Sequence, residues 1–160
     1  MPAARLALTV DPLDVVTVTT AVTESTRGAT GAIVSFIGLV RGENLGRRVR
    51  FLEYEGYEPL ALRAFERIEQ EIHSQWVAAT LGLHHRLGRL EIGEASIAIV
   101  VASPHRTEGF AACRYAIERV KQIAPIWKHE HFDGGEVWIE GATADPMDED
   151  VRRMAFAQCS

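Results

Sequence analysis

Hydrophobic and polar residues alternate along this chain with two periods, one of two residues and one of three to four. Residues 5–10 and 49–55 alternate at every second position, which is typical of strands with one buried face. Residues 31–40 form a nearly continuous apolar run, which predicts a central strand buried on both faces. We expect residues 49–55 to pair back on that strand as an antiparallel neighbour. Further strands are predicted at residues 80–87, 95–102, 126–132 and 136–140.

Helices are predicted where apolar residues recur at helical spacing. Asp11 followed by Pro12 is typical of a helix start, with aspartate at the N-cap and proline at the first helical position. Three further helices are predicted over residues 59–77, 108–123 and 148–157. Thr107 is the predicted N-cap of the second of these. Residues 41–48 are charged and bracketed by glycine, and we expect them to form a mobile loop.

The order of these elements indicates the fold class. Strands and helices are mixed without strict strand–helix–strand alternation, and several strand pairs are close enough in sequence to be hairpins. This favours an α+β fold with a mainly antiparallel sheet and packed helices. At 160 residues the chain is expected to form a single domain over residues 1–160, with the contribution of the tail at about 143–160 left open.

Composition narrows the classes of function. The net charge of −5 does not favour nucleic acid as a partner, so any anion site would have to be a local basic pocket. No apolar run reaches the length of a membrane span, and the first residues lack the pattern of a signal peptide. Two cysteines are too few for a disulfide framework. We therefore expect a cytoplasmic protein without a membrane contact.

The two lysines of the chain stand only seven residues apart. Lys121 and Lys128 are accompanied elsewhere by 15 arginines, since lysine and arginine together number 17. Lysine can lose its proton and act as a nucleophile or an acid–base group, whereas arginine keeps its charge. Two lysines held close together lower each other's pKa. Chance and simple solvent exposure are the alternative explanation of the pattern.

Other basic residues stand at predicted element ends. Arg41 follows the apolar strand, and His105 with Arg106 precedes a helix, where backbone amides also favour anions. If these residues converge with Lys121 and Lys128, they form a pocket for a phosphorylated or carboxylate ligand. Taken singly, Arg41 could be a solvated loop residue, and His105 with Arg106 could simply cap a turn.

A metal site is a further possibility. His129 and His131 would lie on one face of a strand, and a third ligand would have to come from His105 or His84. No cysteine is near and no helical metal motif is present, so surface histidines are the favoured interpretation and no metal or cofactor is predicted. Glycine-rich phosphate loops and dinucleotide fingerprints are also missing from the sequence.

Several ordered segments between about residues 30 and 140 resemble the large, catalytic subunit of molybdopterin synthase, the MoaE-like proteins. No single segment is decisive, but their shared order makes an accidental match improbable. The matching segments are Gly31–Arg41 with Asn44–Gly46, Leu52–Tyr57, His85–Gly88, Ser103–Arg106, Ala124–Lys128 and Gly134–Trp138.

The resemblance implies a sulfurtransferase of molybdenum cofactor biosynthesis with an α/β hammerhead-like fold. Such an enzyme converts cyclic pyranopterin monophosphate (precursor Z) to molybdopterin by inserting two dithiolene sulfurs. The sulfur donor is a small ubiquitin-like carrier whose C-terminal Gly-Gly ends in a thiocarboxylate. The implied assembly is a heterotetramer built on a homodimer of large subunits. The alternative is a non-catalytic scaffold that only binds the Gly-Gly tail.

The resemblance also implies roles for individual residues. Lys121 and Lys128 fall on the two functional lysines of the family. The implied substrate-binding residues are Leu39, Val40, Arg41, His105, Arg106, His129 and Glu130. Two departures stand out, because relatives often carry a basic residue where this chain has His129, and some carry one in the region of residues 141–144.

Overall fold

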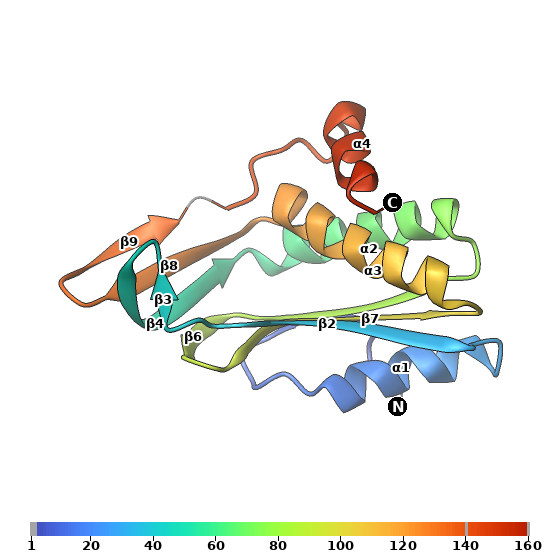
Figure 1. Ribbon diagram of the computed structural model, residues 1–160, viewed down its shortest axis with the longest axis horizontal. Helices are drawn as coiled ribbons and strands as arrows, with labels where there is room; N and C mark the ends of the chain where they lie inside the picture. Colours follow the sequence, from blue (N-terminus) through green and yellow to red (C-terminus); the bar gives the residue numbers. More distant parts are fainter. Residues whose placement is uncertain (1–2, 140, 160) are drawn as a thin grey trace.

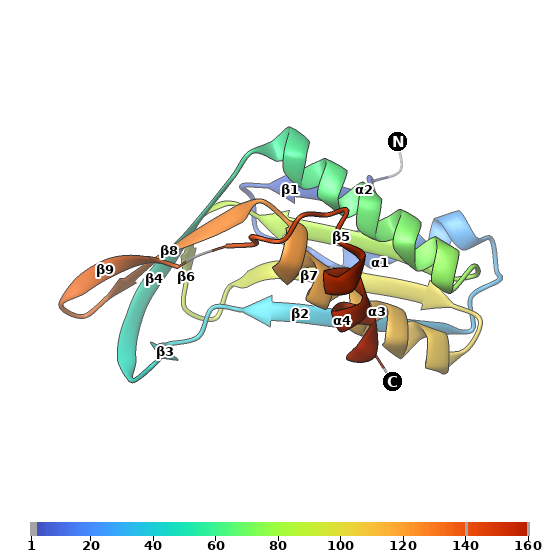
Figure 2. The same cartoon turned by 90° about the horizontal axis from the view of Figure 1, so that it is seen from above.

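The computed structural model describes residues 3–139 and 141–159, which form two β-sheets and the helices packed on them. One sheet is sandwiched between helices, and the other extends beyond its end (Figure 1, Figure 2). The first sheet has the order β1 (Leu6–Thr9), β5 (Thr80–Arg86), β7 (Ala95–Ser103), β2 (Ala32–Leu39). The second contains β3 (Glu43–Asn44), β4 (Arg47–Gly56), β6 (Gly88–Glu91), β8 (Ile126–Phe132) and β9 (Gly135–Ile139). The helices are α1 (Val15–Thr26), α2 (Glu58–Gln75), α3 (Arg106–Ile123) and α4 (Glu149–Ala157).

The core lies on both faces of β7. Its alternate residues face opposite sides, so that Ile99 and Val101 pack toward α2 and α3 while Val100 and Ala102 pack toward α1. Among the described strands of the first sheet, only the β1–β5 pair is parallel. The predicted α+β class with a mainly antiparallel sheet is therefore confirmed. In the described part of the chain, no helix combines the length and apolar content that crossing a membrane requires.

The position predicted for residues 31–40 was wrong. β2 is an edge strand bonded only to β7, and its apolar side chains remain partly open, with Ile33 41%, Phe36 39% and Leu39 57% exposed. A continuous apolar run indicates that both faces of a strand are covered. It does not show whether the cover comes from the same chain or from a second copy. The predicted pairing of residues 49–55 with this strand was also wrong, because β4 pairs with β3, β6 and β8 in the second sheet.

The predicted mobile loop after Arg41 is instead the start of a hairpin. Asn44 pairs with Arg47, and the intervening Leu45 and Gly46 have φ angles of 51° and 74°. Positive φ at both central residues is the geometry of the tight turn that matches strand twist. This hairpin turns the chain out of the first sheet and directs β4 into the second.

Two predicted helix starts were displaced. The N-cap of α1 is Asp14, which accepts hydrogen bonds from the Val16 amide at 3.0 Å and the Thr17 hydroxyl at 2.6 Å. The predicted cap at Asp11 lies outside the helix. In α3 the N-cap is His105, not Thr107. The starts of α2 and α4 agree with the sequence patterns.

A buried charge cluster joins the last three helices. Glu71 of α2 accepts hydrogen bonds from Arg119 Nε at 2.9 Å, Arg119 Nη2 at 2.8 Å and the Tyr115 hydroxyl at 2.8 Å. Arg119 is fully buried, and Arg152 of α4 donates to the Tyr115 oxygen at 3.2 Å. The cluster fixes the C-terminal half of α3, which carries Lys121 two residues beyond Arg119.

Candidate active site

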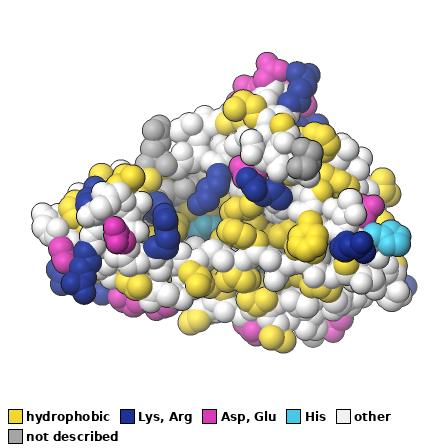
Figure 3. All heavy atoms as spheres, in the orientation of Figure 1, with side chains coloured by type: hydrophobic (Ala, Val, Ile, Leu, Met, Phe, Trp, Pro, Cys, Tyr) yellow, Lys and Arg dark blue, Asp and Glu magenta, His cyan; other side chains and the backbone are white. Residues whose placement is uncertain are grey.

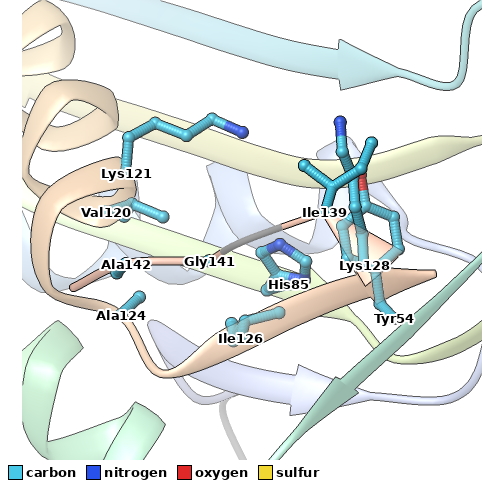
Figure 4. Close-up of a pocket in the computed structure, with 10 residues that line it drawn as sticks. All are labelled: Tyr54, His85, Val120, Lys121, Ala124, Ile126, Lys128, Ile139, Gly141 and Ala142. Carbon is cyan, nitrogen blue, oxygen red and sulfur yellow. The ribbon is translucent and has the colours of Figure 1, made fainter. Parts of the chain in front are cut away.

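The two lysines meet in one cavity at the junction of the sheets. Lys121 extends from the last turn of α3, and Lys128 extends from β8 after the short connection at Pro125. Figure 4 shows both side chains reaching into the same space, close to the His85 ring. Pro125 ends the helix and the chain turns into β8, so that Lys121 and Lys128, seven residues apart in the sequence, face one another as expected.

A wider cavity of about 460 Å³ adjoins this space and shares Tyr54, Lys121 and Lys128 with it. Arg41, beyond the end of β2, and Leu39 also line it. The expected approach of Arg41 to the two lysines is thus present. The remaining lining residues are Phe36, Ile37, Gly38, Asn44, Val49, Leu52, Ser96, Ile97, Ile117 and Glu130. Three basic side chains surround a mixed polar and apolar cavity in a chain of net charge −5.

Val40 differs from its neighbours Leu39 and Arg41. Its side chain is buried in a small hydrophobic cluster with Val49, Leu52 and Leu90. It does not line the cavity, so any substrate contact at this position would come from the backbone.

Glu130 provides the negative charge of the site. Its carboxylate is buried and accepts hydrogen bonds from Asn44 Nδ2 at 2.9 Å and Arg47 Nη2 at 3.1 Å. Both donors come from the β3–β4 hairpin. On β8, Glu130 stands two positions beyond Lys128 and so shares its face of the sheet. The hairpin thus supports a carboxylate beside the catalytic candidate.

The surroundings of Lys128 favour its neutral form. Burial lowers the pKa of Lys128, and the positive charges of Lys121 and Arg41 lower it further, while Glu130 acts in the opposite direction. Lys121 is exposed at the mouth of the cavity. The pair therefore combines a lysine that gives up its proton more easily than usual with a more solvated one.

His85 and Tyr54 belong to the site, although the sequence singled them out only as parts of matching segments. Burial lowers the pKa of His85 to about 4, and the charge of Lys121 acts in the same direction, so the ring is neutral at pH 7. Its Nδ1 lies 2.9 Å from the Arg86 carbonyl oxygen, which can only accept, so Nδ1 carries the proton. Nε2 is then an acceptor. No sequence pattern marked this histidine as buried at a cavity.

His105 and Arg106 lie elsewhere in this chain. Both are exposed at the first turn of α3, whereas Lys121 is in its last turn. Fifteen residues at 1.5 Å per residue separate Arg106 from Lys121 by about 22 Å. One copy of the chain therefore brings together Arg41, Lys121 and Lys128 but not the pair at the helix start.

The His129 side chain also points away from the cavity. Residues 128 and 130 face one side of β8, so His129 and His131 face the other. The expected pairing of these two imidazoles is present, with ring centroids 4.3 Å apart. In the described part of the chain Glu53 groups with both of them as a possible metal ligand, Glu136 pairs with both, and neither His84 nor His105 belongs to that group.

Two lysines and an arginine surround a cavity of this size in an α+β fold. These features are typical of proteins that hold an anionic small molecule and can act on it through lysine chemistry. Comparison with known families gives the particular assignment. The model of the family described as "MoaE protein" matches residues 8–123, and the chain belongs to this family.

Individual relatives agree with the assignment. The chain is 49% identical over 113 residues to the molybdopterin synthase catalytic subunit of Nostoc sp., covering 69% of this chain and 68% of that protein. It is 50% identical over 109 residues to the subunit of the same name from Bacillus subtilis, covering 68% and 69%. The crystal structure of molybdopterin synthase from Staphylococcus aureus superposes with a TM-score of 0.80 at 33% identity, covering 86% of this chain and 98% of that one. The resemblance seen in the sequence is confirmed.

Proposed function

We propose that this chain is the catalytic subunit of a molybdopterin synthase, which transfers sulfur to cyclic pyranopterin monophosphate to form the dithiolene of molybdopterin. The observation that carries the proposal is the convergence of Lys121, Lys128 and Arg41 on one cavity in a member of the MoaE family. A cavity of about 460 Å³ suits a small-molecule substrate.

Lys128 is the proposed acid–base or nucleophilic group. Its lowered pKa gives it a larger neutral fraction near pH 7 than an ordinary lysine has. Attack by a thiocarboxylate sulfur on the pterin requires proton transfers, and a neutral amine beside a cationic one can provide and receive protons. Lys121 and Arg41 are proposed to stabilise the negative charge of the substrate and of the intermediates.

The sulfur donor is proposed to be a small ubiquitin-like carrier protein with a C-terminal Gly-Gly thiocarboxylate. Its tail would have to reach the space between Lys121 and Lys128. Both cysteines of this chain are free thiols, and burial raises the pKa of Cys113 to about 11. Among the described residues that line the cavity there is no cysteine that could carry the sulfur itself. Free thiols also suit the cytoplasmic location that we infer.

We infer a homodimer formed across β2. Figure 3 shows hydrophobic side chains gathered over the middle of the face that carries this strand, and Ile33, Phe36 and Phe110 are among the exposed apolar residues. A twofold axis across an edge strand pairs it with its copy in antiparallel fashion. Because α3 packs on β2 and β7, the two copies of α3 would also run in opposite directions.

This arrangement gives His105 and Arg106 a proposed role. A twofold axis brings the start of α3 in one copy toward the end of α3 in the other. The anion-binding pair of one subunit would then serve Lys121 and Lys128 of its neighbour.

Mixed dimers test this role of His105 and Arg106. Arg106→Ala and Lys128→Ala subunits should each be inactive as homodimers. They should regain activity when combined, because one site per mixed dimer is intact. Mixed dimers as inactive as the parents would refute it.

The proposed function is tested in a reconstituted reaction of the purified chain, the thiocarboxylated carrier and cyclic pyranopterin monophosphate. Molybdopterin should form, and Lys128→Ala should abolish its formation while carrier binding persists. Lys121→Ala should cause a large loss. A wild-type chain that binds the carrier tail but never consumes the pterin would favour the alternative, a non-catalytic scaffold.

A further inference from the structure

A cluster of histidine and glutamate side chains lies on the face of the second sheet that points away from Lys128. His129 and His131 are neighbours on this face of β8. Across the ladders, Glu53 of β4 pairs with His129, and Glu136 of β9 pairs with His131. Three adjacent strands therefore direct two imidazoles and two carboxylates to one place, independently of the proposed active site.

Aromatic packing fixes both imidazoles. The His131 ring stacks on Phe51 with centroids 4.2 Å apart, and the His129 ring stacks on Trp138 with centroids 4.3 Å apart. Both histidine side chains are largely buried, because His131 exposes 19% of its side-chain surface and His129 exposes 15%. Rings held in this way lose little further freedom when they bind a ligand, which favours a formed site over two mobile surface histidines.

The ligand atoms lie at the separations of a metal site. One atom from each of Glu53, His129 and His131 lies within 4.8 Å of the others. Zn²⁺ bonds of about 2.0–2.2 Å in a tetrahedron place ligand atoms about 3.3–3.6 Å apart. His131 Nε2 is 2.7 Å from Glu53 Oε1, and a small rotation of the half-exposed glutamate widens this gap.

A hydrogen-bonded ion pair explains His131 less well. Its Nε2 is buried and, among the described residues, has no hydrogen-bond partner of acceptable geometry, although the Glu53 oxygen is close. The oxygen lies off the line of an N–H bond. Two ligands of one metal ion are arranged in this way. The ion lies along the lone pair of the ring nitrogen, and the second ligand approaches the ion from the side. Arg89, opposite Glu53 on β6, pairs instead with Glu91 at 2.6 Å.

We propose that Glu53, His129 and His131 bind one divalent transition-metal ion, for which Zn²⁺ best matches two imidazoles and one carboxylate. Water completes the coordination. Glu136 Oε2 lies 3.3 Å from His131 Nδ1, and a rotation of this exposed glutamate would let it accept the Nδ1 proton and orient the ring for metal binding through Nε2.

The ion would tie β4 to β8 directly behind Lys128. Binding should therefore stabilise the sheet that holds Lys128 and Glu130 on its opposite face. The three protein ligands come from two strands, and Glu53 and His129 are 76 residues apart in the sequence. Binding therefore requires the folded sheet.

The test is a titration of the tag-free, chelator-treated full chain with Zn²⁺ by calorimetry, accompanied by thermal melts. We expect one ion per chain and a higher Tm with the metal. Co²⁺ in place of Zn²⁺ should give the strong visible absorption of a four-coordinate site. Glu136→Gln should weaken binding by about 10-fold, as loss of an orienting carboxylate does. Glu53→Gln and His131→Gln should weaken it further.

His73→Gln is the matched control, because His73 is an exposed histidine on α2 outside the cluster. It should bind Zn²⁺ as the wild type does. Glu53→Gln guards against a folding defect, since 41% of this side chain is exposed and its metal-free melt should equal that of the wild type. Equal Zn²⁺ affinity in the wild type and in Glu53→Gln, or no stoichiometric binding by the wild type, would overturn the proposal.

Discussion

Glu71 provides the sharpest test of what holds α3 in place. Its carboxylate is 5% exposed and receives two hydrogen bonds from the fully buried Arg119, one from Tyr115 and one from the partly exposed Arg67. Replacing Glu71 by Gln leaves the Arg119 guanidinium buried without its counter-charge. Breaking one partner of a buried ion pair costs about 3–5 kcal/mol. In a chain of this size each kcal/mol lowers Tm by roughly 2–4 °C, so a decrease of the order of 10 °C is expected.

Urea unfolding measures the change directly, as a lower midpoint at an unchanged slope. Replacing both partners, as in Glu71→Leu with Arg119→Met, is the matched control and should recover most of the loss, because the fully buried guanidinium is removed together with its counter-charge, while Arg67 and Arg152 are partly exposed to solvent. A Glu71→Gln protein within about 1 kcal/mol of the wild type would contradict this account of the cluster.

The same carboxylate predicts how stability depends on pH. Burial alone would raise the pKa of Glu71, but the hydrogen bonds from Arg119 and Tyr115 outweigh it, and the pKa is lowered. A lowered folded-state pKa adds stability that is present above the unfolded value and is lost as the pH falls through the folded one. The wild type should therefore lose stability on acidification more steeply than Glu71→Gln does, and parallel curves would refute this.

The perturbed lysine, the edge strand and the packing of α1 can each be tested by one measurement. Because the pKa of Lys128 is lowered, turnover should rise with pH and level off below the value of about 10.4 typical of free lysine; a profile that levels off at that value would argue against a perturbed lysine. Phe36→Glu on β2 should convert the dimer to monomer in light-scattering measurements, and an unchanged mass would exclude this edge as the interface. Gly82→Ala should destabilise the chain by about 1–3 kcal/mol, because the added carbon would lie 2.5 Å from a Val22 methyl; a neutral effect would contradict the tight packing of α1.

Local patterns in the sequence were sufficient for most elements but not for their neighbours. Alternation and proline positions identified β8, β9, α2 and the end of α3. The apolar runs of β2 and β7 look alike, yet β7 is central and β2 is an edge, because strand order depends on long-range pairing. The two-residue turn at Leu45 and Gly46 was missed for a different reason, since Leu is unusual at positive φ.

The residues of the candidate site also differ in how far the sequence could predict them. The lysine pair could be predicted because a helix, a proline and a strand lie within eight residues. Arg41 joined it as expected, whereas His105 and Arg106 stand at the far end of a helix whose length the sequence had already indicated. His85 carried no local signal, because its burial depends on the packing of Tyr54 and α3 around it.

The most direct test of the central claim is the amount of molybdopterin formed in single turnover by Lys128→Arg. Arginine keeps the positive charge and the length of the side chain but cannot give up its proton. If Lys128 acts through its neutral form, the variant should bind substrate and carrier like the wild type yet form product about 10²- to 10⁴-fold more slowly. Product formation at the wild-type rate would show that only the charge of Lys128 matters and would contradict the account.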